Sequence, residues 1–369
     1  MLPALLSLAT SQQRYRETDQ LKTLLQNGAV IYCENRKAPY VSVQLILNNR
    51  DTVDHAESYG YRHLLEHIAA RSIDGHDYEI ETSGGFLLAS TSREWIRFEW
   101  RVPPDKVSYA FKGIDRLVKN PGVSDEVIKR ESIAISHELD LLSTSEIESR
   151  DAWKTVYGVD GIDPLGSKES IVSAKSDDLA TIWRKLTAGG NVVISACGPL
   201  DQKSFTETAK GLLSGLTKSK ASVAAPRAID GSFSTLTTVA VPIAPITTKA
   251  SANALLAVFG LAGRLNRPFV TYTPSERQGL ALVGSTDPSD QIKKFTETED
   301  PAFIFSLGRL NALSWIAAKL STPEGSAELN GTLLSISPSL RPSKLAENFT
   351  YASFADFKRS WDLMKEVAK

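Results

Sequence analysis

Two histidines and a glutamate between Tyr61 and Ile68 have the types and the spacing needed to hold a metal ion. His63, Glu66 and His67 form the pattern His-x-x-Glu-His. Residues three and four apart share one face of a helix, so the two imidazoles would stack one turn apart with the carboxylate on the same side. Two imidazoles can bind one metal ion, and a carboxylate beside them can accept a proton from a metal-bound water. The pattern therefore predicts a metal site.

A second helix is predicted to begin after Ser124, and it carries two further carboxylates. Glu131 and Glu138 are seven residues apart, so they lie two turns apart on nearly the same face. Such a pair is usually solvated, but a hydrolytic metal site with two histidines needs a third protein ligand, most often a carboxylate. The pair is therefore a candidate source of that ligand. His137 adjoins Glu138 but points about 100° away from it, so we do not expect it to bind metal.

Composition is that of an ordinary globular protein. The 369 residues are 42% hydrophobic and 23% charged, with a net charge of −1. This length exceeds one typical core and suggests two domains. The near-zero charge and the scattered aromatic residues argue against a nucleic-acid partner. Because no run of eighteen apolar residues is present, we expect no membrane span.

Two features leave alternatives open. Cys33 and Cys197 lie in apolar, strand-like runs, where buried free thiols are expected, although a disulfide between them is an alternative. The apolar residues 1–10 lack a basic start and a clear cleavage site, so they are either the remnant of an export signal or a loose terminus. Localisation therefore stays open between the cytoplasm and an extracytoplasmic compartment such as the periplasm.

Apolar patterning places these motifs among strands and helices. Strands are expected at 29–33 and 40–47, which would pair as a hairpin, and at 86–91, 95–102, 233–241 and 333–337. Helices are expected at 59–71, 106–119, 124–139, 250–265, 303–320 and 351–367. The aromatic stripe of the last helix is expected to be core.

The motifs resemble those of the M16 metallopeptidases, the family of pitrilysin, insulin-degrading enzyme and the mitochondrial processing peptidase. His-x-x-Glu-His is the inverted zinc-protease signature. The resemblance covers about residues 21–215. The segments that carry it are Leu25–Gly28, Tyr59–His67, Ser83–Ser92, Arg130–Leu139, Pro164–Gly166 and Asn191–Gly198.

A fold and a domain division follow from this resemblance. It implies an α+β fold of two similar halves, each an antiparallel sheet backed by helices. The chain would then divide into a flexible segment 1–20, a zinc-binding domain 21–215, a linker 216–230 and a shortened, divergent second domain 231–369.

The resemblance also implies a function and a set of site residues. The chain would be a zinc-dependent endopeptidase that hydrolyses peptides or small unfolded polypeptides in an enclosed chamber. His63, His67 and Glu138 would bind one Zn²⁺, Glu66 would be the general base, and Glu131 would orient a zinc ligand. A substrate peptide would lie as an added strand on an exposed sheet edge. The candidate edge residues are Phe86, Leu87, Leu88, Ala89 and Ser90.

Three positions depart from the family pattern. Leu88 stands where the family often has an asparagine that helps to hold the substrate. In the second half, Ser275 and Leu282 stand where the family has an arginine and a tyrosine that reach the substrate from the opposing half. Arg277 or Tyr272 could substitute by position, although no spacing argument supports either.

These departures give alternative assemblies. In one, a heterodimer forms with a second M16-like chain that supplies the arginine and the tyrosine. In another, the chain is a homodimer with weak or narrow activity. A third alternative is a catalytically inactive M16-like subunit that binds peptide or supports a heteromeric assembly. The intact set of His63, Glu66, His67 and Glu138 favours an enzyme over a scaffold.

Overall fold

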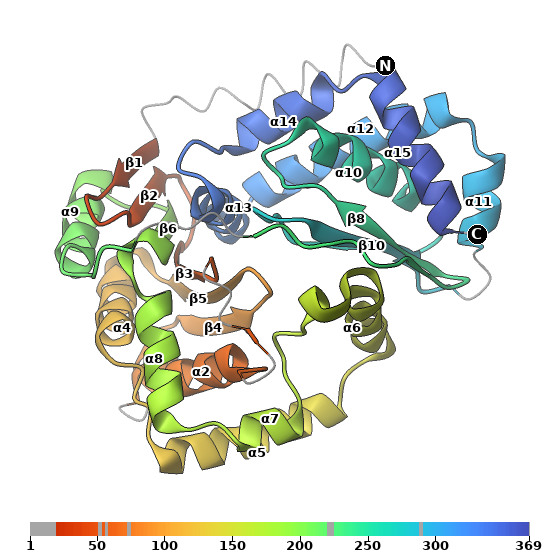
Figure 1. The fold of residues 1–369 in the computed structure, drawn as a ribbon. Coiled ribbons are helices and arrows are strands. Elements are labelled where there is room, and N and C mark those ends of the chain that lie inside the picture. Colours follow the sequence, from red (N-terminus) through yellow and green to blue (C-terminus); the bar gives the residue numbers. More distant parts are fainter. Residues whose placement is uncertain are drawn as a thin grey trace.

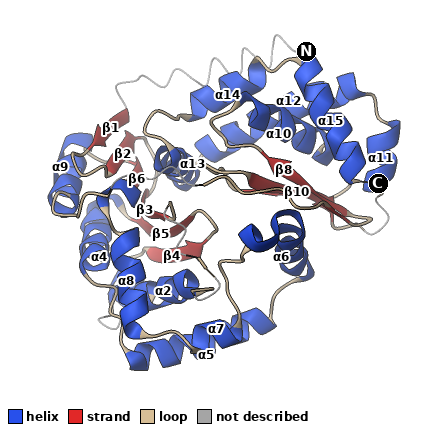
Figure 2. Cartoon of the chain, in the orientation of Figure 1, coloured by secondary structure: helices blue, strands red, loops and turns tan. Residues whose placement is uncertain are grey.

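Two sheets, each with its own hydrophobic core, organise the molecule (Figure 1). The computed structural model describes residues 20–50, 54–55, 58–71, 75–219, 225–287 and 291–368. Figure 2 shows helices packed on both sheets, so the α+β architecture of two halves is confirmed. The flexible segment expected at 1–20 lies, except for Gln20, outside the described residues. The domain boundaries at 215 and 231 stay a prediction.

Within the described residues, the first sheet has six strands in the order β1-β2-β6-β3-β5-β4. Its strands are β1 (Gln20–Leu24), β2 (Val30–Asn35), β3 (Val41–Asn48), β4 (Phe86–Thr91), β5 (Trp95–Val102) and β6 (Val192–Gly198). The helices of this half are α2 (Tyr61–Ala70), α3 (His76–Thr82), α4 (Val107–Lys119), α5 (Asp125–Asp140), α6 (Thr144–Tyr157), α7 (Lys168–Val172), α8 (Ser176–Leu186) and α9 (Gln202–Leu213).

The expected hairpin of β2 and β3 is wrong, because β6 lies between the two strands. Val30 of β2 is paired with Val193 in a parallel register, and Leu45 of β3 is paired with Ile194 in an antiparallel one. β6 is a fully buried apolar strand that pairs on both sides. Local spacing cannot reveal this insertion, because β6 follows β3 by more than a hundred residues along the chain.

In the part of the chain that the structure describes, the second sheet has four strands in the order β7-β8-β10-β9. Its strands are β7 (Phe233–Ser234), β8 (Thr238–Ile243), β9 (Pro268–Tyr272) and β10 (Gly279–Ser285). Its helices are α10 (Lys249–Ala262), α11 (Ile292–Thr298), α12 (Pro301–Leu320), α13 (Pro323–Ile336), α14 (Pro342–Thr350) and α15 (Phe354–Val367). The single strand expected at 233–241 is thus divided into β7 and β8. In α15 the stripe residues Phe357, Trp361 and Met364 are fully buried, so the predicted core role of these three is confirmed.

One helix of each half packs on the sheet of the other half. Helix α13 of the second half packs on β3 and β6, where its Leu334 joins Ile46 and Val193 of the first sheet. Helix α6 of the first half packs on the second sheet, where its Tyr157 lies with Leu280 and Leu282 of β10. Figure 1 shows α6 beneath β8 and β10 and α13 beside the first sheet. This exchange ties the two halves together.

The strand expected at 333–337 is wrong, because Leu333 to Ile336 form the last turn of α13. A short apolar run fits a buried helix as well as it fits a strand. Leu334 packs on the first sheet while Leu333 joins the core of the second half, so opposite sides of this turn meet apolar partners. The run is therefore apolar throughout although it is helical.

Substituting Gly308 by alanine should lower the free energy of unfolding by about 3 kcal/mol. Gly308 lies on α12 where α12 crosses α10, and a Cβ atom there would lie 2.1 Å from the carbonyl oxygen of Leu256. Backbone cannot move away as a flexible side chain can. The matched control is Gly211→Ala on α9, where a Cβ atom meets nothing within 4 Å. Urea unfolding should show Gly211→Ala slightly stabilised, and equal stability of both variants would contradict the prediction.

Both cysteines are buried and free, as expected. Cys33 of β2 is paired with Ala196 of β6, and Cys197 is paired with Glu34. Because successive side chains of a strand point to opposite faces, the two sulfur atoms lie on opposite faces of the sheet. Among the described residues, no helix is long and apolar enough to cross a membrane.

Candidate metal centre

Helix α2 presents the two histidines from a buried, fixed position. Leu64 and Leu65 are fully buried in the first core and anchor the helix. The helix begins after Gly60, whose φ of 81° suits glycine and whose Cα lies against Gly166. This close approach brings the Leu165 carbonyl oxygen to 3.1 Å from His63 Nδ1. With Nδ1–H donating to that carbonyl, Nε2 of His63 is free to bind a metal.

Helix α5 brings the third candidate ligand to the same place. Ser124 caps this helix by accepting a hydrogen bond from the Val127 amide, as its sequence predicted. Oε2 of Glu138 lies 3.5 Å from Nε2 of His63 and 3.3 Å from Nε2 of His67. Across the described ranges, this is the one group of three or more metal-binding side chains that comes together, with donor atoms all within 4.8 Å of one another.

The donor atoms fit a zinc ion. Ligands at about 2.0–2.1 Å from zinc in a tetrahedron lie about 3.3 Å from each other, close to the distances of 3.5 and 3.3 Å that separate Glu138 Oε2 from the two histidine nitrogens. Both histidines are buried, but the Glu138 side chain is 49% exposed. The third candidate ligand therefore lies on the side of the group that is open to solvent. His137 is exposed and does not belong to the group.

Glu131 lies behind the histidines rather than among them. It is fully buried, and its carboxylate is bound by Arg130 at 2.8 Å and Arg71 at 3.2 Å. Its Oε2 lies 3.6 Å from Nδ1 of His67, on the side of the ring opposite to the candidate metal-binding nitrogen. The family resemblance predicts that Glu131 orients a zinc ligand. Its place beside the His67 ring is compatible with that role.

Glu66 lies beside the histidines and is 9% exposed. Burial raises the pKa of its carboxyl, which His63 opposes. Thr91 Oγ1 donates a hydrogen bond to Glu66 Oε2 at 3.1 Å. A raised pKa suits a group that must take up and release a proton near neutrality. The sequence motif contained Thr91, but nothing in it indicated this contact.

The candidate substrate strand is an edge strand of the first sheet, as expected. Among the strands that the structure describes, β4 pairs with β5 alone, from Phe86 with Arg101 to Thr91 with Ile96. Leu87 and Ala89 pack against the core, whereas Phe86 and Leu88 are 42% and 46% exposed. The strand therefore leaves one row of backbone groups and one apolar row of side chains open to a partner.

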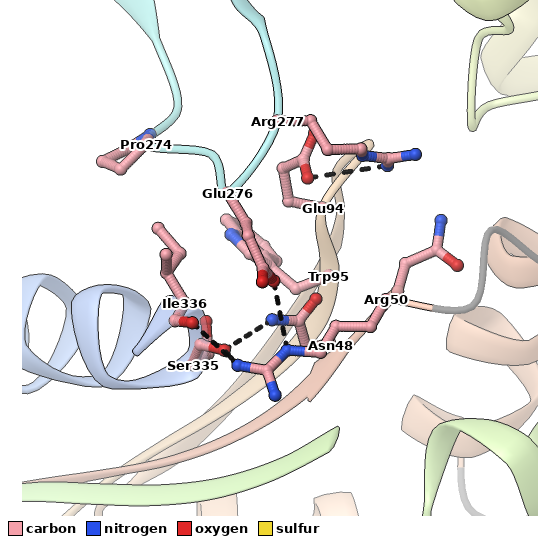
Figure 3. Close-up of a pocket in the computed structure, with 10 residues that line it drawn as sticks. Asn48, Arg50, Glu94, Trp95, Pro274, Glu276, Arg277, Ser335 and Ile336 are labelled. Carbon is pink, nitrogen blue, oxygen red and sulfur yellow. Dashed lines mark hydrogen bonds and ion pairs between the residues drawn. The ribbon is translucent and has the colours of Figure 1, made fainter. Parts of the chain in front are cut away.

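The two second-half positions that depart from the family pattern are buried. Ser275 and Leu282 are each 2% exposed, and Leu282 is covered by α6. Arg277 is 6% exposed and its guanidinium forms an ion pair with Glu94 (Figure 3), so it does not replace the missing arginine. Tyr272 lines a cavity of about 320 Å³ whose other lining residues include none of the candidate metal ligands.

Comparison with known proteins supports the resemblance seen in the sequence. The family model described as Insulinase (Peptidase family M16) matches residues 29–152. The beta subunit of the mitochondrial-processing peptidase of Dictyostelium discoideum is 25% identical over 216 residues, which are 56% of this chain and 46% of that protein. The alpha subunit from Solanum tuberosum is 25% identical over 206 residues, 53% of this chain and 40% of that protein. The chain thus spans about half the length of the curated relatives it matches.

Solved structures show the same fold over nearly the whole chain. A protease from Helicobacter pylori has a TM-score of 0.77 at 14% identity, covering 93% of this chain and 96% of that one. A protein from Alicyclobacillus acidocaldarius, described as an M16-like peptidase, has a TM-score of 0.73 at 13% identity, covering 93% and 94%. At these identities the likeness establishes the fold alone.

Proposed function

We propose that this chain, which is similar to the M16 peptidases in sequence and fold, is a zinc-dependent endopeptidase that hydrolyses peptides or small unfolded polypeptides. The observation that carries the proposal is the meeting of His63, His67 and Glu138 around one point, with Glu66 beside them. A scaffold subunit has no need for all four groups. The buried histidines and the half-exposed Glu138 together form a site with one open side.

Zinc held by these three residues would polarise the peptide carbonyl and make water a better nucleophile at neutral pH. The chain's own residues perform the proton transfers. Glu66 accepts a proton from the attacking water at its carboxylate and returns it to the leaving amine. Thr91 holds one oxygen of that carboxylate, and Leu165 holds the His63 ring. Glu131 fixes His67 from behind.

The substrate would bind as an added strand along β4. The unpaired backbone groups of an edge strand recognise an extended peptide without regard to its sequence. Phe86 and Leu88, the exposed apolar row, would contact alternate side chains of the peptide. The enclosed chamber that the family resemblance implies would admit peptides and small unfolded chains, which can adopt the extended form that β4 requires.

We further propose that the active assembly is a heterodimer. This chain has Ser275 and Leu282 where the family has an arginine and a tyrosine, and both residues are buried. It therefore offers no arginine–tyrosine pair at those positions. A second M16-like chain would supply the pair, and the relatives of this chain include both alpha and beta subunits of one peptidase. A homodimer is the competing assembly. The missing arginine–tyrosine pair also supports the second candidate function, an inactive M16-like subunit that binds peptide or stabilises a heteromeric complex.

One experiment separates these proposals. The purified chain is analysed for zinc content, for mass in solution and for cleavage of casein and of a set of unstructured peptides, with and without a chelator. We expect one zinc per chain and chelator-sensitive cleavage that is weak until an M16-like partner is added. A fully active homodimer would exclude the heterodimer. Stoichiometric zinc without hydrolysis of any peptide, with or without the partner, would favour the inactive subunit.

A further inference from the structure

Four consecutive residues, Thr91 to Glu94, contact three separate parts of the molecule. They comprise the last residue of β4 and the turn that leads into β5. Thr91 donates a hydrogen bond to the carboxylate of Glu66. The carbonyl oxygens of Ser92 and Arg93 accept hydrogen bonds from Arg62 at 2.7 and 3.3 Å. The Glu94 side chain contacts arginines that follow residue 225. This segment therefore joins the candidate base, the metal-binding helix and the second half.

Arg62 is the link between this segment and helix α2. It immediately precedes His63, and its side chain is fully buried. Asp54 binds the Nε edge of its guanidinium at 2.9 Å, while Nη2 reaches the two carbonyls of the turn. Arg62 lies in the first helical turn of α2. Because its guanidinium binds the carbonyl oxygens of Ser92 and Arg93, a movement of these two residues moves the start of the helix that carries His63.

Glu94 links this segment to two later parts of the chain, the predicted linker through Arg227 and the second half through Arg277. Its side chain is buried, and its carboxylate accepts a hydrogen bond from Nη2 of Arg227 at 2.7 Å. Nη2 of Arg277, from the loop between β9 and β10, lies 3.6 Å from its other oxygen (Figure 3). Arg227 is itself fixed, because its Nη1 donates to the carbonyl oxygen of Gln278 at 2.7 Å. Burial raises the pKa of Glu94, but the two arginines outweigh it and lower the pKa overall.

A buried carboxylate with two arginines is a strict geometric constraint. Exposed ion pairs contribute little and tolerate movement, whereas a buried charge that loses its partner is strongly destabilised. The turn has therefore one favourable position relative to Arg227 and Arg277. The hydrogen bonds between β4 and β5 hold these two strands to each other, but they do not fix them relative to the second half.

We propose that Glu94 is a positioning residue, through which the second half of the chain sets the placement of Glu66 and of the start of helix α2. In this arrangement Arg277 acts on the candidate active site from a distance, by holding Glu94, instead of contacting substrate. The inference rests on the proposed function only for the role of Glu66 in catalysis. The mechanical link from Arg277 to Glu66 does not depend on it.

Glu94, Arg227 and Arg277 are together called the clamp. The test compares two variants of the clamp with a matched control in the full-length, zinc-loaded chain. Glu94→Gln keeps the shape and one hydrogen bond but removes the charge, and Arg277→Met removes the partner. The control is Glu328→Gln, which breaks the ion pair of Glu328 with Arg97 at 2.8 Å, a contact that also joins the halves but lies outside the turn. Hydrogen–deuterium exchange is followed in peptides that cover α2, β4 and, for reference, β8 and β10.

We expect amide exchange in β4 and in the first turn of α2 to become about tenfold faster in both clamp variants, with β8 and β10 unchanged. Peptide cleavage should show a kcat about tenfold lower with zinc content retained. Glu328→Gln should change neither measurement. If Glu94→Gln does not fold, Arg277→Met alone decides the matter.

Exchange in β4 and α2 that stays unchanged, or that rises equally in β8 and β10, would overturn the inference, because the clamp would then contribute to global stability alone. The expected exchange pattern in a chain without peptidase activity would support the link and would count against the proposed function instead. The two ideas can therefore fail separately.

Discussion

Replacing Glu66 by glutamine should lower kcat for peptide hydrolysis about a thousandfold while zinc remains bound. Glutamine has almost the same shape as glutamate and can still accept the hydrogen bond from Thr91. It cannot accept a proton from the attacking water. The candidate ligands His63, His67 and Glu138 are untouched, so metal content should stay at one per chain. The loss should therefore appear in kcat and not in the zinc content.

The matched control for this variant is Glu81→Gln on α3, an exposed glutamate of the same half. Both proteins are measured for zinc by elemental analysis and for cleavage of one peptide over a range of concentrations. Full activity of Glu66→Gln with zinc bound would show that Glu66 is not the base. Loss of zinc together with activity would show instead that Glu66 contributes to metal binding.

Replacing His67 by alanine should weaken zinc binding by more than a hundredfold, because even residues that merely orient a ligand contribute about 10–100-fold. Glu138→Gln should have a comparable effect, since a neutral amide is a poorer zinc ligand than a carboxylate. Glu131→Gln should weaken zinc binding by about 10–100-fold, because Glu131 lies 3.6 Å from the His67 ring and touches no candidate metal position.

The control within this series is His137→Ala. His137 is the neighbour of Glu138 on α5, but it is exposed and lies outside the candidate ligand group. Zinc affinity is measured by competition with a chromophoric chelator at fixed pH, since protons compete with the metal for histidine. A His137→Ala variant as weak as His67→Ala would refute the ligand set, and a Glu131→Gln variant with unchanged affinity would remove the orienting role from Glu131.

Local spacing in the sequence was sufficient for the elements that carry the candidate site. His63, Glu66 and His67 required only that one segment be helical, since helical geometry alone places residues three and four apart on one face. The back of this segment carries the apolar residues Leu64 and Leu65, and both are fully buried. The cap at Ser124 and the spacing of Glu131 and Glu138 were equally local signals.

The family resemblance added what spacing could not. Nothing in the spacing of residues 61–68 and 124–139 says that α2 and α5 meet, and the resemblance supplied the combination of Glu138 with the two histidines. The expectation that residues 86–90 form a sheet edge came instead from the Gly84–Gly85 break before them, and the strand order confirms the edge. The resemblance did not indicate where the residues that replace the family's arginine and tyrosine would lie.

Tertiary structure alone decided the features that depend on contacts between distant segments. The insertion of β6 between β2 and β3, and the helical state of Leu333 to Ile336, both follow from packing partners far away in the sequence. The hydrogen bond from Thr91 to Glu66 and the capture of Glu94 by Arg227 and Arg277 are of the same kind. The periodicity of apolar residues shows which side of an element is buried, because buried side chains are mostly apolar. It does not show which other element packs against that side. The sequence therefore determined that His63, Glu66 and His67 share one helix face, whereas only the fold decided that Glu94 meets Arg227 and Arg277.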